Sequence, residues 1–289
     1  MIDPTVGSLR VNGATLHYEV RGQGPLLLLI PGGTGGTATF EDIVDGLAAE
    51  YTVATYDPRG MSRSTLDEPE AEQTVAEHAE DALRIIELLS PDEPVRVFGA
   101  SSGAIVALHL LSAHPERVAR VVAHEPPVVE ILPDAADHRA LLAHVRDTLR
   151  AQGLMPAMTV FAAGLKGDGE SAPKPEIKLP PRASARAEQT MADLSYFVGR
   201  IVPGFMSYAP DIRRLKALSN RLALVGGQDS QGELPYRATA RLAEHLGTDL
   251  LHFPGGHIGL TTHPTEFGES LRKTLRAWTS GSDVSGRIW

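Results

Sequence analysis

The most constraining feature of this 289-residue chain is a short stretch in which a strand-like segment, a turn of small residues and an apolar helix-like segment follow one another. Residues 95–98 contain valine and phenylalanine, and residues 105–111 are almost entirely apolar. Between them the sequence reads G-x-S-x-G, with Ser101 between Gly99 and Gly103. Small neighbours permit a very tight strand-to-helix turn, which projects the central hydroxyl beyond the sheet. The stretch therefore predicts a nucleophilic serine at a sheet edge.

Alternating patterns of buried strands and amphipathic helices surround this turn. Leu26–Ile30 is a run of five apolar residues, which is typical of a strand covered on both faces. Residues 71–89 carry apolar side chains at helical spacing. Such an alternation with short links predicts an α/β fold with a doubly wound, mostly parallel sheet flanked by helices. An antiparallel hairpin around Asn12 and Gly13 is expected to lead into the sheet.

The alternation stops in the middle of the chain. Residues 125–218 contain helical patterns and a stretch rich in Gly, Pro, Lys and Glu, but no convincing buried strand. We expect residues 1–124 and 219–279 to form the core, and residues 125–218 to form a helical cap or lid inserted after the sixth strand. Residues 280–289 are expected to form a loose polar tail.

Composition excludes several classes of function. A net charge of −9 argues against nucleic acid as the main partner, and the lack of cysteine removes thiolate metal sites and a cysteine nucleophile. Histidine and carboxylate spacings typical of metal sites are also missing, so we expect neither a metal nor a cofactor. The first residues do not resemble a secretory signal, and the longest apolar run is too short to span a membrane. We therefore expect a cytoplasmic protein that acts on a small molecule.

A serine hydroxyl needs a neighbouring base, and that base needs an acid to orient it. Asp229 follows a buried-strand pattern and a pair of glycines, and His257 lies in a glycine-flanked turn after the next strand pattern. Both are expected at the sheet edge that holds Ser101, which predicts a Ser101–His257–Asp229 triad. Glu125 is an alternative acid, because it follows another buried strand.

These motifs resemble the α/β-hydrolase superfamily, and in particular its serine-nucleophile, capped, esterase-like members. Residues 57–64 are similar to the family's turn after its fourth strand, and residues 31–33 occupy its oxyanion loop, although Pro31 stands where many relatives have His. By position in that loop and after the nucleophile, the backbone amides of Gly33 and Ser102 are expected to form the oxyanion hole, with Thr34 as the alternative to Gly33.

The resemblance implies a serine hydrolase that cleaves an ester, thioester or lactone of a small, largely apolar molecule through an acyl-enzyme. A serine at position 101 disfavours the epoxide-hydrolase and dehalogenase branches, which attack through a carboxylate. A cofactor-free lyase, a carbon–carbon hydrolase, a perhydrolase and a non-catalytic ligand-binding or receptor protein remain alternatives on the same scaffold. Seven apolar residues of the expected cap either line the pocket or form the cap's own core: Met155, Met158, Phe161, Phe197, Phe205, Met206 and Tyr208.

Overall fold

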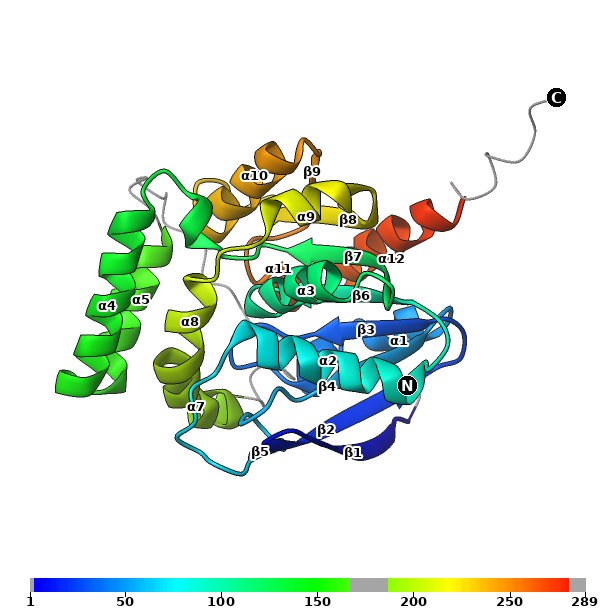
Figure 1. The fold of residues 1–289 in the computed structure, drawn as a ribbon, viewed down its shortest axis with the longest axis horizontal. Helices are drawn as coiled ribbons and strands as arrows, with labels where there is room; N and C mark the ends of the chain where they lie inside the picture. The colour runs from blue at the N-terminus through cyan, green and yellow to red at the C-terminus, as the bar shows by residue number, and fades with distance from the viewer. Residues whose placement is uncertain (1–2, 167–186, 281–289) are drawn as a thin grey trace.

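The computed structural model describes residues 3–166 and 187–280. Its centre is a nine-stranded sheet in the order β1-β2-β4-β3-β6-β7-β8-β9, with β5 paired to β2 (Figure 1). The neighbours from β4 to β9 are parallel, and β1, β2 and β5 pair antiparallel. The predicted mostly parallel α/β sheet is therefore confirmed. The strands are β1 (Thr5–Val11), β2 (Ala14–Arg21), β3 (Leu26–Ile30), β4 (Thr52–Tyr56), β5 (Thr65–Leu66), β6 (Val95–Ala100), β7 (Val118–His124), β8 (Leu222–Gly227) and β9 (Leu250–Phe253).

The predicted hairpin joins β1 and β2. Val11 lies opposite Ala14 in the register, so Asn12 and Gly13 form a two-residue turn. Gly13 has a φ of 74°, a left-handed conformation that glycine adopts without steric cost.

The apolar run in β3 is buried on both sides of the sheet. Leu27 and Leu29 belong to one hydrophobic cluster, while Leu26, Leu28 and Ile30 belong to a second. Successive side chains of a strand point to opposite faces, so a strand between two helical layers needs an apolar residue at every position. The run without a polar face is explained by this double coverage.

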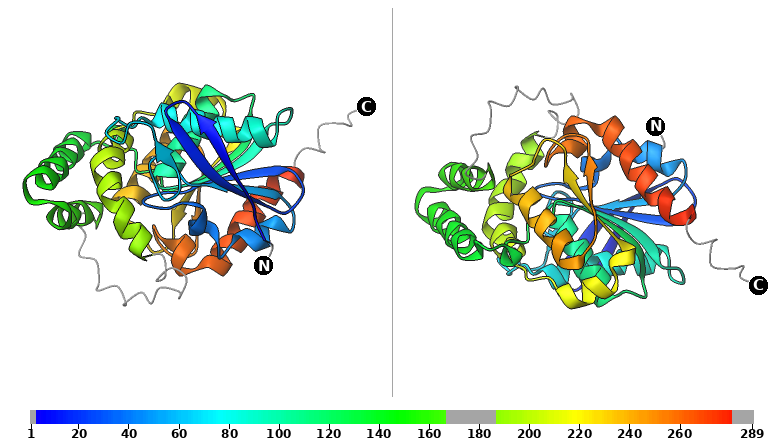
Figure 2. Two further views of the ribbon diagram at one scale, coloured as in Figure 1. Left: turned by 90° about the horizontal axis from the view of Figure 1, so that it is seen from below. Right: turned by 90° about the horizontal axis from the view of Figure 1, so that it is seen from above.

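Helices cover both faces of the sheet. α2, α3 and α10 contribute to the cluster on one face, and α12 and α1 to the cluster on the other. The views from below and above show these two layers with the sheet between them (Figure 2). The helices are α1 (Val44–Ala48), α2 (Val75–Leu89), α3 (Ser102–Ala113), α4 (Ala135–Gln152), α5 (Leu154–Lys166), α7 (Ala187–Tyr196), α8 (Val202–Met206), α9 (Ile212–Ala217), α10 (Leu234–Leu246), α11 (Gly259–Thr262) and α12 (Pro264–Ser280).

The helices from α4 to α9 lie between β7 and β8 in the chain. In Figure 1, α4, α5, α7 and α8 lie beyond the ends toward which β3 and β7 point. Asp193 on α7 joins this insertion to the core, because its carboxylate accepts hydrogen bonds from the Ser62 backbone at 3.1 and 3.2 Å. The Tyr196 hydroxyl donates to the Arg59 carbonyl at 3.2 Å. That this insertion acts as a cap stays a prediction.

The insertion follows β7, which is the sixth strand of the chain when the two-residue strand β5 is not counted. β5 pairs with β2 and has no apolar run that would reveal it in the sequence. Residues 167–181 of the Gly- and Pro-rich stretch, and residues 281–289 of the expected tail, lie outside the described residues. Within residues 3–166 and 187–280, no helix is both long enough and apolar enough to cross a membrane.

Candidate active site

Ser101 lies in a very tight turn between β6 and α3. Its φ of 52° is in the left-handed region, which side chains with a Cβ rarely adopt. The turn is crowded: a Cβ at Gly99 would lie within 3 Å of the Gly103 backbone, and a Cβ at Gly103 would lie within 3 Å of the carbonyl of Ile30. The two glycines of the motif are therefore explained by close backbone approaches on both sides of the serine.

His257 reaches Ser101 from the loop that follows β9. Its Nε2 is 3.1 Å from the Ser101 hydroxyl oxygen, close enough to accept the hydroxyl proton. The other ring nitrogen, Nδ1, is 2.7 Å from Oε2 of Glu125. A histidine held in this way by a carboxylate can act as the general base for a serine.

Glu125 immediately follows β7, and its side chain is fully buried. Its φ of 47° is positive, and its backbone N–H donates to the carbonyl of Val225 in β8 at 3.0 Å. In the described ranges the non-glycine residues with positive φ are Ser62, Ser101 and Glu125. Two of them, Ser101 and Glu125, contact His257. Such strain is a feature of functional sites.

The expectation that Asp229 orients His257 is not what the geometry shows. β8 continues through Gly227, and the chain then turns so that the side chain at position 229 is exposed and the side chain of Ser230 is fully buried. Glu125, the alternative acid, lies against His257 instead. Strand patterns indicated the correct edge of the sheet for both carboxylates, but the direction of the turn after β8 decided which one faces the histidine.

The second carboxylate oxygen of Glu125 is also held. Oε1 accepts a hydrogen bond from the Gly227 backbone at 2.8 Å and another from the hydroxyl of Ser230. Burial alone would raise the pKa of the Glu125 carboxyl, but the hydrogen bond and charge of His257, with the hydrogen bond from Ser230, lower this pKa to about 2. The carboxylate is therefore charged at neutral pH, and hydrogen bonds hold both of its oxygens in place. The sequence did not indicate that Ser230 would hold this carboxylate, because a single serine after a strand carries no distinctive signal.

The two expected oxyanion donors lie next to each other. The Gly33 N–H donates to the side-chain oxygen of Ser102 at 3.1 Å, and Ser102 is the first residue of α3, where a helix leaves its backbone N–H without a partner in the helix. Gly32 packs so closely on the turn that a Cβ there would lie within 3 Å of the Ala100 carbonyl. Gly33 lines the cavity beside Ser101 and His257 and Thr34 does not, so Gly33 is the better placed of the two alternatives.

A cavity of about 260 Å³ opens beside Ser101 and His257. Its walls are mainly apolar and come from both the core and the insertion. Of the seven apolar insertion residues named from the sequence, four line it: Phe161, Phe197, Phe205 and Met206. Met155, by contrast, is 63% exposed. Within the described ranges, no group of three or more His, Cys, Asp or Glu side chains is arranged to hold a metal ion.

Comparison with known proteins identifies the family. The sequence model of the alpha/beta hydrolase fold matches residues 25–264. This chain is an α/β-hydrolase. The predicted family and fold are thus confirmed, as is the prediction that the chain belongs to an enzyme family.

The α/β-hydrolase has relatives that are named as hydrolases. It is 34% identical over 276 residues to the "Uncharacterized hydrolase YraK" of Bacillus subtilis, a match that covers 93% of this chain and 95% of the relative. It is 36% identical over 119 residues to a zearalenone hydrolase of Bionectria ochroleuca, covering 40% of this chain and 45% of the relative. A thermophilic esterase from Thermogutta terrifontis shares the fold, with a TM-score of 0.71, 18% identity and coverage of 95% and 98% of the two chains.

Proposed function

We propose that this α/β-hydrolase cleaves an ester, thioester or lactone of a small, largely apolar molecule through an acyl-enzyme on Ser101. The observation that carries the proposal is the hydrogen-bonded chain from Glu125 through His257 to Ser101, with heavy-atom distances of 2.7 and 3.1 Å. The apolar cavity beside Ser101 also supports the proposal, because the size of this cavity suits a short acyl group.

The proposed reaction proceeds in two steps. His257 takes the Ser101 proton while the serine oxygen bonds to the substrate carbonyl carbon. Collapse of the tetrahedral intermediate breaks the bond to the leaving group, which receives that proton from His257. Water then attacks the acyl-enzyme by the same route and releases the acid. Glu125 keeps the ring oriented and stabilises its protonated form.

The amides of Gly33 and Ser102 are proposed to bind the oxyanion. Gly33 would then exchange its hydrogen bond with the Ser102 hydroxyl for one with the substrate oxygen. Donors that are already oriented cost little reorganisation at the moment of reaction, which is the basis of oxyanion stabilisation. A cytoplasmic location and a role of the insertion as a cap complete the proposal.

A fluorophosphonate probe together with Ser101→Ala tests the proposal. We expect the probe to label wild-type protein at Ser101, and we expect both labelling and hydrolysis of short acyl esters to disappear in Ser101→Ala. Ser270→Ala is the matched control, because Ser270 is a partly exposed serine on α12 that does not line the cavity. Equal labelling of wild type and Ser101→Ala would contradict the proposal. Labelling of Ser101 without turnover of any ester would favour a lyase or a binding protein.

A further inference from the structure

A second, larger cavity adjoins the candidate active site. It measures about 700 Å³ and shares five lining residues with the apolar cavity: Gly32, Gly33, Thr39, Ile258 and Thr261. The oxyanion loop thus forms part of both walls. A substrate whose carbonyl lies at this loop can extend one half into each cavity.

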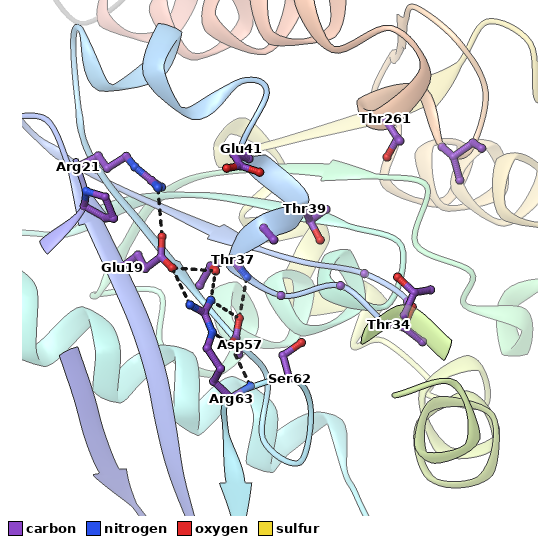
Figure 3. A pocket seen from close by; sticks show the side chains of 18 residues that line it. Glu19, Arg21, Thr34, Thr37, Thr39, Glu41, Asp57, Ser62, Arg63 and Thr261 are labelled. Carbon is purple, nitrogen blue, oxygen red and sulfur yellow. Dashed lines mark hydrogen bonds and ion pairs between the residues drawn. The ribbon is translucent and has the colours of Figure 1, made fainter. Parts of the chain in front are cut away.

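The larger cavity exposes a greater share of polar surface than the apolar cavity, and four of its five charged side chains, all but Glu41, are paired with one another. Glu19 lies between two guanidinium groups, 3.2 Å from Arg21 and 3.1 Å from Arg63. Arg63 also donates to the buried carboxylate of Asp57 at 2.8 Å and to the hydroxyl of Thr37. Figure 3 shows this network on one side of the cavity, with Thr34 and Thr261 on the other.

This network decides which charges the cavity accepts. Both arginines in the described part of the lining are engaged by Glu19 or Asp57, so an anionic ligand would have to break an existing ion pair to reach a cation. Glu41 adds a further carboxylate to the lining. We therefore expect a negatively charged group to be disfavoured.

Hydroxyl groups form the rest of the polar lining. Thr34, Thr39, Thr190 and Thr261 contribute to the walls, and each threonine hydroxyl can both donate and accept a hydrogen bond. That capacity matches the hydroxyl groups of an uncharged ligand. The Arg63 side chain is 50% exposed, so this side of the site is open to solvent, which suits a group that leaves after the first step.

We propose that the polar cavity binds an uncharged, hydroxyl-bearing leaving group, while the apolar cavity binds the acyl group. The proposal rests on the proposed ester hydrolysis and narrows its substrate class to esters of an apolar acid with a hydroxylated alcohol. The bond that breaks is the one between the acyl carbon and the alcohol oxygen, and the free alcohol departs through the polar cavity.

Three butanoate esters with different alcohols test this inference. We compare glyceryl, propyl and carboxymethyl butanoate, which carry a hydroxylated, an apolar and an anionic leaving group on the same acyl chain. Two additional hydrogen bonds from hydroxyl groups predict a kcat/KM about tenfold higher for the glyceryl than for the propyl ester. The carboxymethyl ester is expected to be slower than the propyl ester.

Two variants connect these preferences to the cavity. Thr34→Val keeps the side-chain shape and removes one hydroxyl, so the ratio of glyceryl to propyl kcat/KM should fall about threefold. Glu41→Gln should raise the carboxymethyl rate relative to the propyl rate. Thr159→Val is the matched control, since Thr159 is exposed on α5 and does not line the cavity.

The outcomes separate this inference from the proposed function. Turnover of propyl butanoate that depends on Ser101, with no preference for the glyceryl ester, would overturn the polar subsite and leave the hydrolase proposal standing. A preference that is unchanged in both Thr34→Val and Glu41→Gln would also overturn it. No turnover of any of the three esters would contradict both proposals.

Discussion

At the scale of single residues, the carboxylate of Glu125 is the most tightly specified group in the site. It is fully buried, and it accepts hydrogen bonds from His257, Gly227 and Ser230. A buried charge is tolerated only when it is paired and hydrogen-bonded in this way. The same contacts set the orientation of the histidine ring.

Substitution of each candidate acid should therefore have very different effects. Glu125→Gln keeps the shape but removes the charge, and we expect kcat for ester hydrolysis to fall by roughly 10⁴-fold, as is typical when the acid of a serine triad becomes an amide. Asp229→Asn changes an exposed side chain and should alter kcat by less than about twofold. Steady-state kinetics of the two variants with one ester would measure this, and the reverse ranking would assign the acid to Asp229.

Ser230 is a positioning residue for the same carboxylate. Ser230→Ala removes one donor to Glu125 and leaves the carboxylate freer to turn, so we expect kcat to fall roughly tenfold with little change in KM. A change confined to KM would contradict this role. Ser270→Ala again provides a control, at a serine that does not line the cavity.

At the scale of elements, the site depends on how closely β6, α3 and the oxyanion loop approach one another. Gly32, Gly99 and Gly103 each face backbone atoms of a neighbouring segment at distances that leave no room for a side chain. Because the atoms in contact are backbone atoms, they cannot rotate away as a side chain would. The rigid contact of these elements keeps Ser101 and the amide of Gly33 in register.

A pair of glycine substitutions tests this packing. Gly103→Ala should lower the free energy of unfolding by about 1–3 kcal/mol, because the new methyl group would overlap the carbonyls of Ile30 and Pro31. Gly46→Ala places the same methyl group in α1, where nothing lies within 4 Å, and should be neutral or stabilising by about 0.5–1 kcal/mol. Urea denaturation would measure both changes, and equal destabilisation would show that crowding at the turn is not the cause.

At the scale of the whole molecule, buried histidines make stability depend on pH. His78 on α2 is 4% exposed and packs edge-on against Phe205 of α8, so it lies where the core meets the insertion. Burial, assisted by the nearby Arg59, lowers the pKa of His78 to about 3. Burial likewise lowers the pKa of His124, beneath the active site, to about 4.

The sign of the pH effect follows from these values. Between about pH 6.5 and the lowered pKa, the unfolded chain binds a proton at each histidine and the folded chain does not, so stability falls as pH falls. We expect wild type to lose about 2 kcal/mol more than His78→Gln between pH 7 and pH 5. Denaturant unfolding at the two pH values would test this. His245→Gln, at an exposed position, should lose as much stability as wild type.

Much of this architecture could be predicted because local patterns determine it. The apolar run of β3, the Asn12–Gly13 turn and the small residues around Ser101 each satisfy a requirement of their own backbone segment, such as burial on both faces or a very tight turn. Parallel strands end at one edge of a sheet, and for that reason His257 and both candidate acids could be expected near Ser101 before their geometry was known.

Other features depend on contacts between segments far apart in the chain. The choice of Glu125 over Asp229 required the direction of the chain after β8, which Gly227 and Ser230 fix through hydrogen bonds to a residue about 100 positions earlier. The polar cavity likewise joins Glu19 of β2, Asp57 and Arg63 of the segment after β4, and Thr261 of α11. The sequence by itself determined the family, the sheet and the serine with its histidine, since these follow from short-range patterns. Only the tertiary structure decided which carboxylate faces His257 and what shape the two cavities have, because hydrogen bonding and packing across the fold set the direction of each side chain.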